Sequence, residues 1–136
     1  HSNFTNNTVL RSFFDGIHVK DSRHNLFDNN TFASNTDDGI EFDGKSLTKN
    51  NNVTNSNFHS NDYAVYMDSG ENNYSLLSNN YMYQDTVFLG GQNSILEKSI
   101  ISEAAIGVYL VRILSNPQVK TYSLEARALQ MQTLNS

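Results

Sequence analysis

The chain has 136 residues, a net charge of −5 and no cysteine, which excludes disulfides and thiol chemistry. Its length fits one domain with a modest core. Nine Lys and Arg residues are spread thinly, so no basic stripe indicates nucleic-acid binding, and no apolar run reaches the length of a membrane span.

Three short segments make up the first repeat unit, and they centre on Phe4, on Val9 and on residues 16–19. Their apolar residues alternate with polar ones or stand singly, which is typical of half-buried strands. The pair Asn6-Asn7 separates the first two segments, and Asn tolerates the left-handed backbone that tight turns need. We therefore expect three strands per coil.

The third segment recurs at spacings of 23, 25, 22 and 21 residues, starting at Gly16, Gly39, Ala64, Thr86 and Gly107. A period in this range indicates stacked units, because one such unit cannot bury its apolar face alone. The first segment recurs at Leu26-Phe27, Val53, Leu76-Leu77 and Ile95-Leu96, and the second at Phe32, Phe58, Tyr81 and Ile100-Ile101.

The Asn pair recurs with the repeat as Asn29-Asn30, Asn55-Ser56 and Ser78-Asn79, and the fifth unit has Glu97-Lys98 instead. Stacked coils bring such side chains about 4.8 Å apart, where amides can hydrogen-bond along the stack. The sequence predicts an all-β fold, a parallel β-helix of about five coils over residues 1–111. Leucine-rich and helical repeats are excluded by the missing leucine motif and the missing 3.6-residue period.

Residues 112–136 change character, and residues 121–134 predict a short amphipathic helix. Leu124, Ala128 and Met131 would share one face, and Thr121 would cap the start. We expect this tail to cap the open end of the solenoid. The first coil has no such cover, so we expect either a piece of a longer solenoid or self-association through the open coil ends.

Alternation along the third strand directs one set of side chains outward. It predicts a column of His18, Glu41, Tyr66, Phe88 and Tyr109, and beside it Lys20, Asp43 and Asp68. We predict catalytic roles for His18 or Tyr66 as base and for Glu41 and Asp43 as acids. Lys20, Asp68, Phe88 and Tyr109 would bind the substrate. The alternative is a solvated polar face whose opposite charges stabilise the ladder.

Oxygen ligands for Ca²⁺ are expected from Asp37, Asp38, Asp43 and Asp68. No metal site built from His is predicted, because no two His residues share a column. An acidic outer face would take a neutral glycan, or a polyuronate bridged by Ca²⁺.

Residues 29–32 (Asn-Asn-Thr-Phe), 37–42 (Asp-Asp-Gly-Ile-Glu-Phe) and 55–58 (Asn-Ser-Asn-Phe) carry a family resemblance. The chain resembles right-handed parallel β-helix proteins with carbohydrate-binding and sugar-hydrolase-type repeats, over about residues 3–111. Similar proteins include mannuronan C5-epimerases, pectate and alginate lyases, copper-binding accessory proteins and non-enzymatic surface proteins. The Asp-Pro-His motif of the epimerases is absent, since the matching stretch reads His18-Val19-Lys20. Only Glu41 or Asp43 has a plausible counterpart in that family.

The resemblance implies a polysaccharide partner and a place outside the cell, at its surface or in the periplasm. Five Asn-X-Ser/Thr sequons, beginning at Asn3, Asn6, Asn29, Asn52 and Asn73, are compatible with that place. Two functions remain open. The chain is either part of a polysaccharide lyase, epimerase or hydrolase, or a non-catalytic glycan-binding or filament-forming surface module.

Overall fold

The computed structural model is built from parallel strands that wind around a common axis. It describes residues 1–43, 47–67, 74–90, 93–112, 118–120, 123–125 and 129–133, with side chains as far as residue 109. No helix occurs in these ranges, and hence none with the length and apolar character of a membrane span.

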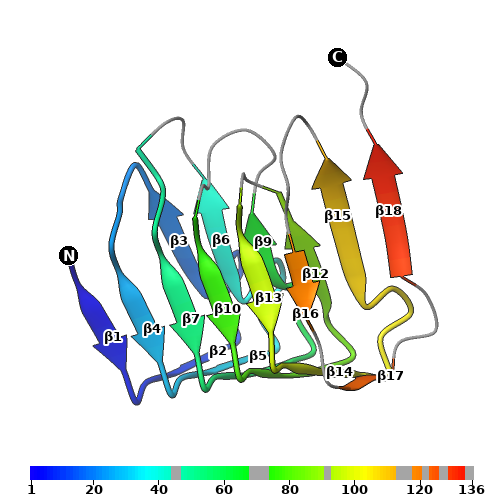
Figure 1. Ribbon diagram of the computed structural model, residues 1–136. Coiled ribbons are helices and arrows are strands. Elements are labelled where there is room, and N and C mark those ends of the chain that lie inside the picture. The colour runs from blue at the N-terminus through cyan, green and yellow to red at the C-terminus, as the bar shows by residue number, and fades with distance from the viewer. Residues whose placement is uncertain are drawn as a thin grey trace.

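Three sheets of six parallel strands enclose the interior, and each sheet takes every third strand of the chain (Figure 1). Sheet A contains β1 (Asn3–Thr5), β4 (Leu26–Asp28), β7 (Asn52–Thr54), β10 (Leu76–Ser78), β13 (Ile95–Glu97) and β16 (Gln118–Lys120). Sheet B contains β2 (Thr8–Leu10), β5 (Thr31–Ala33), β8 (Asn57–His59), β11 (Tyr81–Tyr83), β14 (Ile100–Ser102) and β17 (Ser123–Glu125). Sheet C contains β3 (Ile17–Lys20), β6 (Ile40–Asp43), β9 (Tyr63–Met67), β12 (Thr86–Leu89), β15 (Val108–Arg112) and β18 (Leu129–Thr133). The predicted parallel β-helix is thus confirmed.

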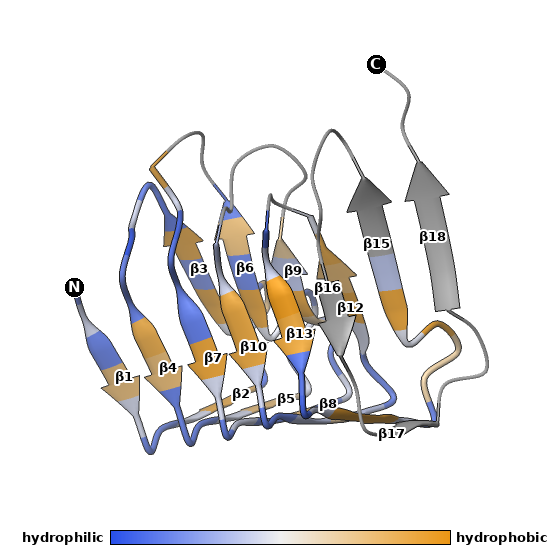
Figure 2. Cartoon of the chain, in the orientation of Figure 1, coloured by the Kyte–Doolittle hydropathy of each residue, from blue (hydrophilic) through white to orange (hydrophobic). Residues whose placement is uncertain are grey.

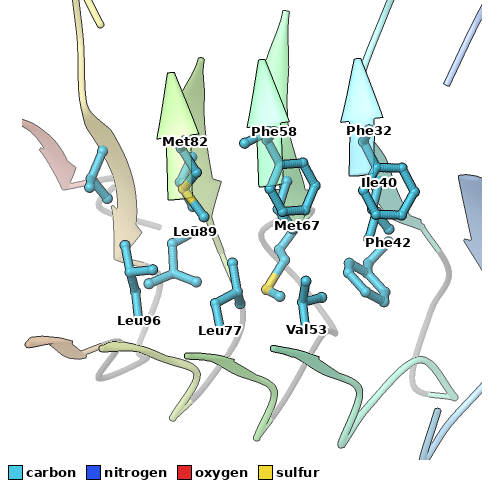
Figure 3. Close-up of a cluster of buried hydrophobic side chains, with 14 of the residues drawn as sticks. Phe32, Ile40, Phe42, Val53, Phe58, Met67, Leu77, Met82, Leu89 and Leu96 are labelled. Carbon is cyan, nitrogen blue, oxygen red and sulfur yellow. The ribbon is translucent and has the colours of Figure 1, made fainter. Parts of the chain in front are cut away.

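The core is a set of apolar columns that run along the axis, one or two from each sheet (Figures 2 and 3). Phe32, Phe58 and Met82 share one column of sheet B and are fully buried. The rings of Phe32 and Phe58 stack with centroids 5.1 Å apart and planes 13° apart. Val53, Leu77 and Leu96 form the facing column of sheet A. Each rung contributes only a few side chains, so the core is thin and depends on exact register between rungs.

At most corners between the sheets, a residue with positive φ is followed by a residue whose side chain belongs to an internal ladder of hydrogen bonds. Between sheets A and B the positive-φ residues are Asn6, Asn29, Asn55, Asn79 and Lys98. In the ladder that follows them, the backbone N–H of each rung donates to the side-chain oxygen of the next. The bonds are Asn7 to Asn30 (2.9 Å), Asn30 to Ser56 (3.1 Å), Ser56 to Asn80 (2.9 Å) and Asn80 to Ser99 (3.2 Å).

The other two corners carry ladders of their own, which the sequence analysis did not predict. The corner between sheets B and C uses Asn35, Asn61 and Asp85, and the corner between sheets C and A uses Asn25, Asn51, Ser75 and Ser94. These bonds satisfy backbone groups that the turns would otherwise bury unpaired. They also hold residues such as Tyr74 and Gln84 at positive φ, where a side chain is unfavourable.

One predicted turn was placed one residue too early. The fourth rung uses Asn79-Asn80 rather than Ser78-Asn79, because Met82, and not Tyr81, is in register with Phe58. Met82 is fully buried and Tyr81 is exposed. The fifth rung likewise turns at Lys98-Ser99. When the register of a strand shifts by one residue, every side chain moves to the opposite face. The choice of Tyr81 as the buried residue, made because it is aromatic, therefore shifted the predicted turn by one position.

The helix predicted over residues 121–134 is wrong for the described part of that range. Two strands form there, β17 and β18, and they continue sheets B and C. Leu124 is in register with Ile101, while Leu129 and Met131 are in register with Val108 and Leu110. The apolar residues Leu129 and Met131 stand two apart, which suits the next rung of a sheet better than one face of a helix. The end-capping role of the tail stays a prediction.

Candidate functional site

The outward residues of sheet C stand in the predicted column. His18 is in register with Glu41, and Glu41 with Tyr66. Tyr66 is in register with Phe88, and Phe88 with Tyr109. Lys20 and Asp43 form the start of the second column. Asp68, predicted to follow Asp43, lies outside the described residues.

The imidazole of His18 lies among three carboxylates. Its Nδ1 is 3.6 Å from Asp15 Oδ2 and 3.4 Å from Glu41 Oε2, and its Nε2 is 3.4 Å from Asp43 Oδ2. Lys20 Nζ donates to the same Asp43 oxygen at 3.1 Å. We call these five residues, Asp15, His18, Lys20, Glu41 and Asp43, the His18 cluster. The structure therefore joins three of the four predicted catalytic residues, and it leaves Tyr66 one rung further along.

Asp15 is the member that sequence reasoning missed. It lies in the turn before β3, outside the alternating strand pattern. A Cβ atom on the next residue, Gly16, would come within 2.6 Å of the Gly39 carbonyl oxygen, and one on Gly39 within 2.5 Å of the Ala64 oxygen. Small residues therefore let successive rungs approach closely here. The repeated Asp-Gly of residues 15–16 and 38–39 was the signal in the sequence.

A second acidic group adjoins the cluster. Ligand oxygens of Asp15, Asp37 and Asp38 lie within 4.8 Å of one another. Asp38 is only 4% exposed, and burial together with the charges of Asp37 and Asp15 raises its pKa to about 8. The backbone N–H of Tyr63 donates to Asp38 Oδ1 at 3.3 Å and opposes that rise only in part. The buried carboxyl group of Asp38 thus keeps its proton to a higher pH than an exposed aspartate does.

Two pKa values within the His18 cluster are raised as well, those of Glu41 and Lys20. Burial, and then a hydrogen bond with the Asp15 carboxylate, raises the pKa of Glu41 above its usual value. The hydrogen bond to Asp43 raises the pKa of Lys20, which stays charged. The cluster thus combines a carboxyl group whose pKa is raised with an imidazole and a fixed cation, which are groups that acid–base chemistry uses.

The expected Ca²⁺ ligands are not brought together as one set among the described residues. Asp37 and Asp38 gather with Asp15, whereas Asp43 faces His18 and Lys20. A calcium ion held by Asp37 and Asp38 stays a prediction, with Asp15 as the third carboxylate within reach.

The aromatic column is a stack in which the rings cover one another. The centroids of Tyr66 and Phe88 lie 4.5 Å apart with planes 24° apart, and those of Phe88 and Tyr109 lie 5.0 Å apart with planes 12° apart. Tyr63, which was not predicted, places its ring edge-on to Tyr66 and Phe88. The rung spacing therefore turns the ring faces toward their neighbours. A sugar would meet mainly ring edges and hydroxyl groups, rather than a row of open faces.

The comparisons with known proteins agree with this architecture. The family model described as the right-handed beta helix region matches residues 1–128. A comparison with curated proteins finds no similar sequence. Because the match spans most of the chain and the strands form a parallel solenoid, the chain belongs to the right-handed β-helix family.

Proposed function

We propose that this protein is an extracellular polysaccharide-binding β-helix whose sugar lies along the outer face of sheet C. The observation that carries the proposal is the line of outward side chains from His18 and Glu41 to Tyr66, Phe88 and Tyr109, in which each residue is in register with the next. A linear polymer needs such an extended surface, because several of its sugar units must be bound at once.

Contacts to the sugar would come from both halves of this line. In the first half, the carboxylates of Glu41 and Asp43 accept hydrogen bonds from sugar hydroxyls, and Lys20 donates them. In the second half, Tyr66 and Tyr109 offer ring edges and phenol groups. The acidic balance of the face favours a neutral glycan over a polyuronate, which would need Ca²⁺ between the two negative surfaces.

Catalysis is the finer part of the proposal. Glu41 holds a proton above its usual pKa range and lies 3.4 Å from His18. In an eliminative cleavage of a polyuronate, His18 would accept the proton of the sugar carbon beside the carboxylate as the glycosidic C–O bond breaks, and Glu41 would donate its proton to the leaving oxygen on the same face. Asp43 would keep the imidazole oriented.

The test is a panel of neutral and acidic polysaccharides, with and without Ca²⁺, which reads binding and product formation together. Tyr66→Ala should weaken binding at least tenfold. Tyr81→Ala is the matched control, because this exposed tyrosine lies on sheet B. Glu41→Gln should abolish any turnover and leave the unfolding temperature nearly unchanged. Equal binding by both tyrosine variants, or no binding to any polysaccharide, would contradict the proposal.

End-to-end assembly is a second candidate, and the first coil supports it. Among the described strands, β1, β2 and β3 pair on one side only. Phe4, Val9 and Ile17 of these strands are only partly buried against the core. An unpaired strand edge is a template for another chain. Analytical ultracentrifugation at micromolar concentration tests this candidate, and a monomer of 15.3 kDa at all concentrations would rule it out.

A further inference from the structure

We propose that Asp15, His18 and Glu41 form a binding site for a divalent transition-metal ion of the zinc type. The ligands are Nδ1 of His18 and one oxygen of each carboxylate, and these atoms lie within 4.8 Å of one another. The ion would occupy atoms of His18 and Glu41 to which the catalytic part of the proposed function assigns proton transfer, so its test reads binding of the ion alone, without any sugar.

Distances around His18 Nδ1 fit an ion better than direct ion pairs. The nitrogen is 3.4 Å from Glu41 Oε2 and 3.6 Å from Asp15 Oδ2, whereas charge-assisted hydrogen bonds measure about 2.7 to 2.9 Å. Two ligand atoms that each lie about 2.05 Å from a tetrahedral ion are about 3.3 Å apart. The two separations from Nδ1 therefore match two edges of such a site, and the ion would replace the proton in the hydrogen bond between Glu41 and Asp15.

The other nitrogen of the imidazole supports the same assignment. Nε2 faces Asp43 Oδ2 at 3.4 Å. A metal-bound His usually donates its second N–H to a carboxylate, so binding of the ion should shorten this contact to a hydrogen bond. Lys20 holds that carboxylate in place through its 3.1 Å hydrogen bond. This contact directs Nδ1, and not Nε2, toward Asp15 and Glu41.

Asp15 is also oriented for the task. Its Oδ1 accepts the backbone N–H of Asp38 at 3.3 Å, and its Oδ2 is the oxygen that faces His18. The side chain of Asp15 is 11% exposed and that of Glu41 27%, while His18 is 44% exposed. The two carboxylates are thus held by the protein, and the imidazole side stays open to solvent, where a fourth ligand such as water can bind.

The residue types decide which ion is favoured. An imidazole nitrogen with two carboxylates suits Zn²⁺ and its neighbours, whereas Ca²⁺ takes oxygen ligands alone. A metal site built from His was not predicted, because no two His residues share a column. One His is sufficient here, because the turn before β3 supplies Asp15 as the third ligand.

Isothermal titration of the purified chain with ZnCl₂, in the absence of any sugar, tests the site. We expect one Zn²⁺ per chain at the cluster, loss of that binding in His18→Ala, and a loss of tenfold or more in Glu41→Gln, which keeps the side-chain shape. Asp43→Asn should weaken the affinity by about 10- to 100-fold, as expected for a positioning partner. X-ray absorption at the zinc edge should show nitrogen and oxygen ligands at about 2.0 to 2.1 Å.

The matched control is His24→Ala. The rings of His1 and His24 stack with centroids 4.7 Å apart, so this pair is the alternative place for zinc. Zinc binding should persist in His24→Ala with unchanged affinity. Binding that survives in His18→Ala and Glu41→Gln, or that disappears in His24→Ala, would overturn the proposal, and circular dichroism of each variant confirms that it is folded.

Discussion

The inner and outer residues of sheet C come from the same strands but follow opposite rules. Inward positions are apolar in every rung, and the column of Ile40, Val65 and Val87 is fully buried. Outward positions change from an imidazole and a carboxylate to three aromatic rings. Packing therefore determines the inside, whereas the outside is left free to carry chemistry. Variants on the two sides should separate these roles.

The largest effect is expected from Phe58→Ala on the inside. Phe58 is fully buried, and its ring centroid lies 5.1 Å from that of Phe32. Its removal leaves a cavity in a core to which each rung contributes only a few side chains. We expect the free energy of unfolding to fall by about 3 to 5 kcal/mol. Urea denaturation measures the change.

The control for Phe58→Ala is its neighbour His59, which lies on the exposed side of the same strand. His59→Ala should change the free energy of unfolding by less than about 0.5 kcal/mol. Similar losses of unfolding free energy in the two variants would contradict the assignment of Phe58 to the buried side and His59 to the exposed side of β8.

This separation also explains how much could be predicted from sequence. The alternation of Ile17, His18, Val19 and Lys20 was sufficient for the outward column, because each side chain's direction follows from the period of a strand. Stacking of the coils then gave the pairs His18 with Glu41 and Lys20 with Asp43, which the register confirms.

The direction of a side chain in a turn does not follow from strand alternation, and this is why Asp15 was missed. Asp15 joins the His18 cluster from a turn, and its position depends on the close approach of rungs at Gly16 and Gly39.

The rungs at residues 123–133 were mistaken for a helix, since their short apolar segments also fit a 3.6-residue spacing. Three-dimensional pairing with β14 and β15 decides between the two.

A smaller effect, and a stabilising one, is expected from Asp85→Asn in the corner ladder. Asp85 is fully buried and accepts two hydrogen bonds from Asn61, from the backbone N–H at 2.9 Å and from the amide at 2.6 Å. Burial raises its pKa to about 6 from 3.8. An Asn at this position keeps one acceptor oxygen, which would accept both bonds as Asn61 Oδ1 does from the backbone N–H and the amide of Asn35. Its amide would donate to a backbone carbonyl, as Asn61 does to Phe32.

The sign of the pH dependence follows from the direction of that shift. Between about pH 4 and pH 6 the folded chain binds a proton at Asp85 that the unfolded chain has released, so stability falls as pH rises through this window. A shift of about two units corresponds to about 3 kcal/mol at neutral pH. Asp85→Asn should regain this amount at pH 7 and match the parent near pH 3.5. A variant that is less stable than the parent at pH 7 would show that the ladder needs the carboxylate.

The smallest effect is expected from Phe88→Ala, the outside counterpart of Phe58→Ala. Phe88 is half-buried, and its ring stacks between Tyr66 and Tyr109. Ring pairs of this kind contribute about 0.5 to 1.5 kcal/mol beyond their buried area, so we expect a loss of about 1 to 2 kcal/mol. Urea denaturation beside Phe58→Ala makes the comparison direct. Equal losses would mean that the aromatic column stabilises the fold as much as the core does. Only the rungs of His18 and Glu41 would then be available to bind a sugar without a structural role.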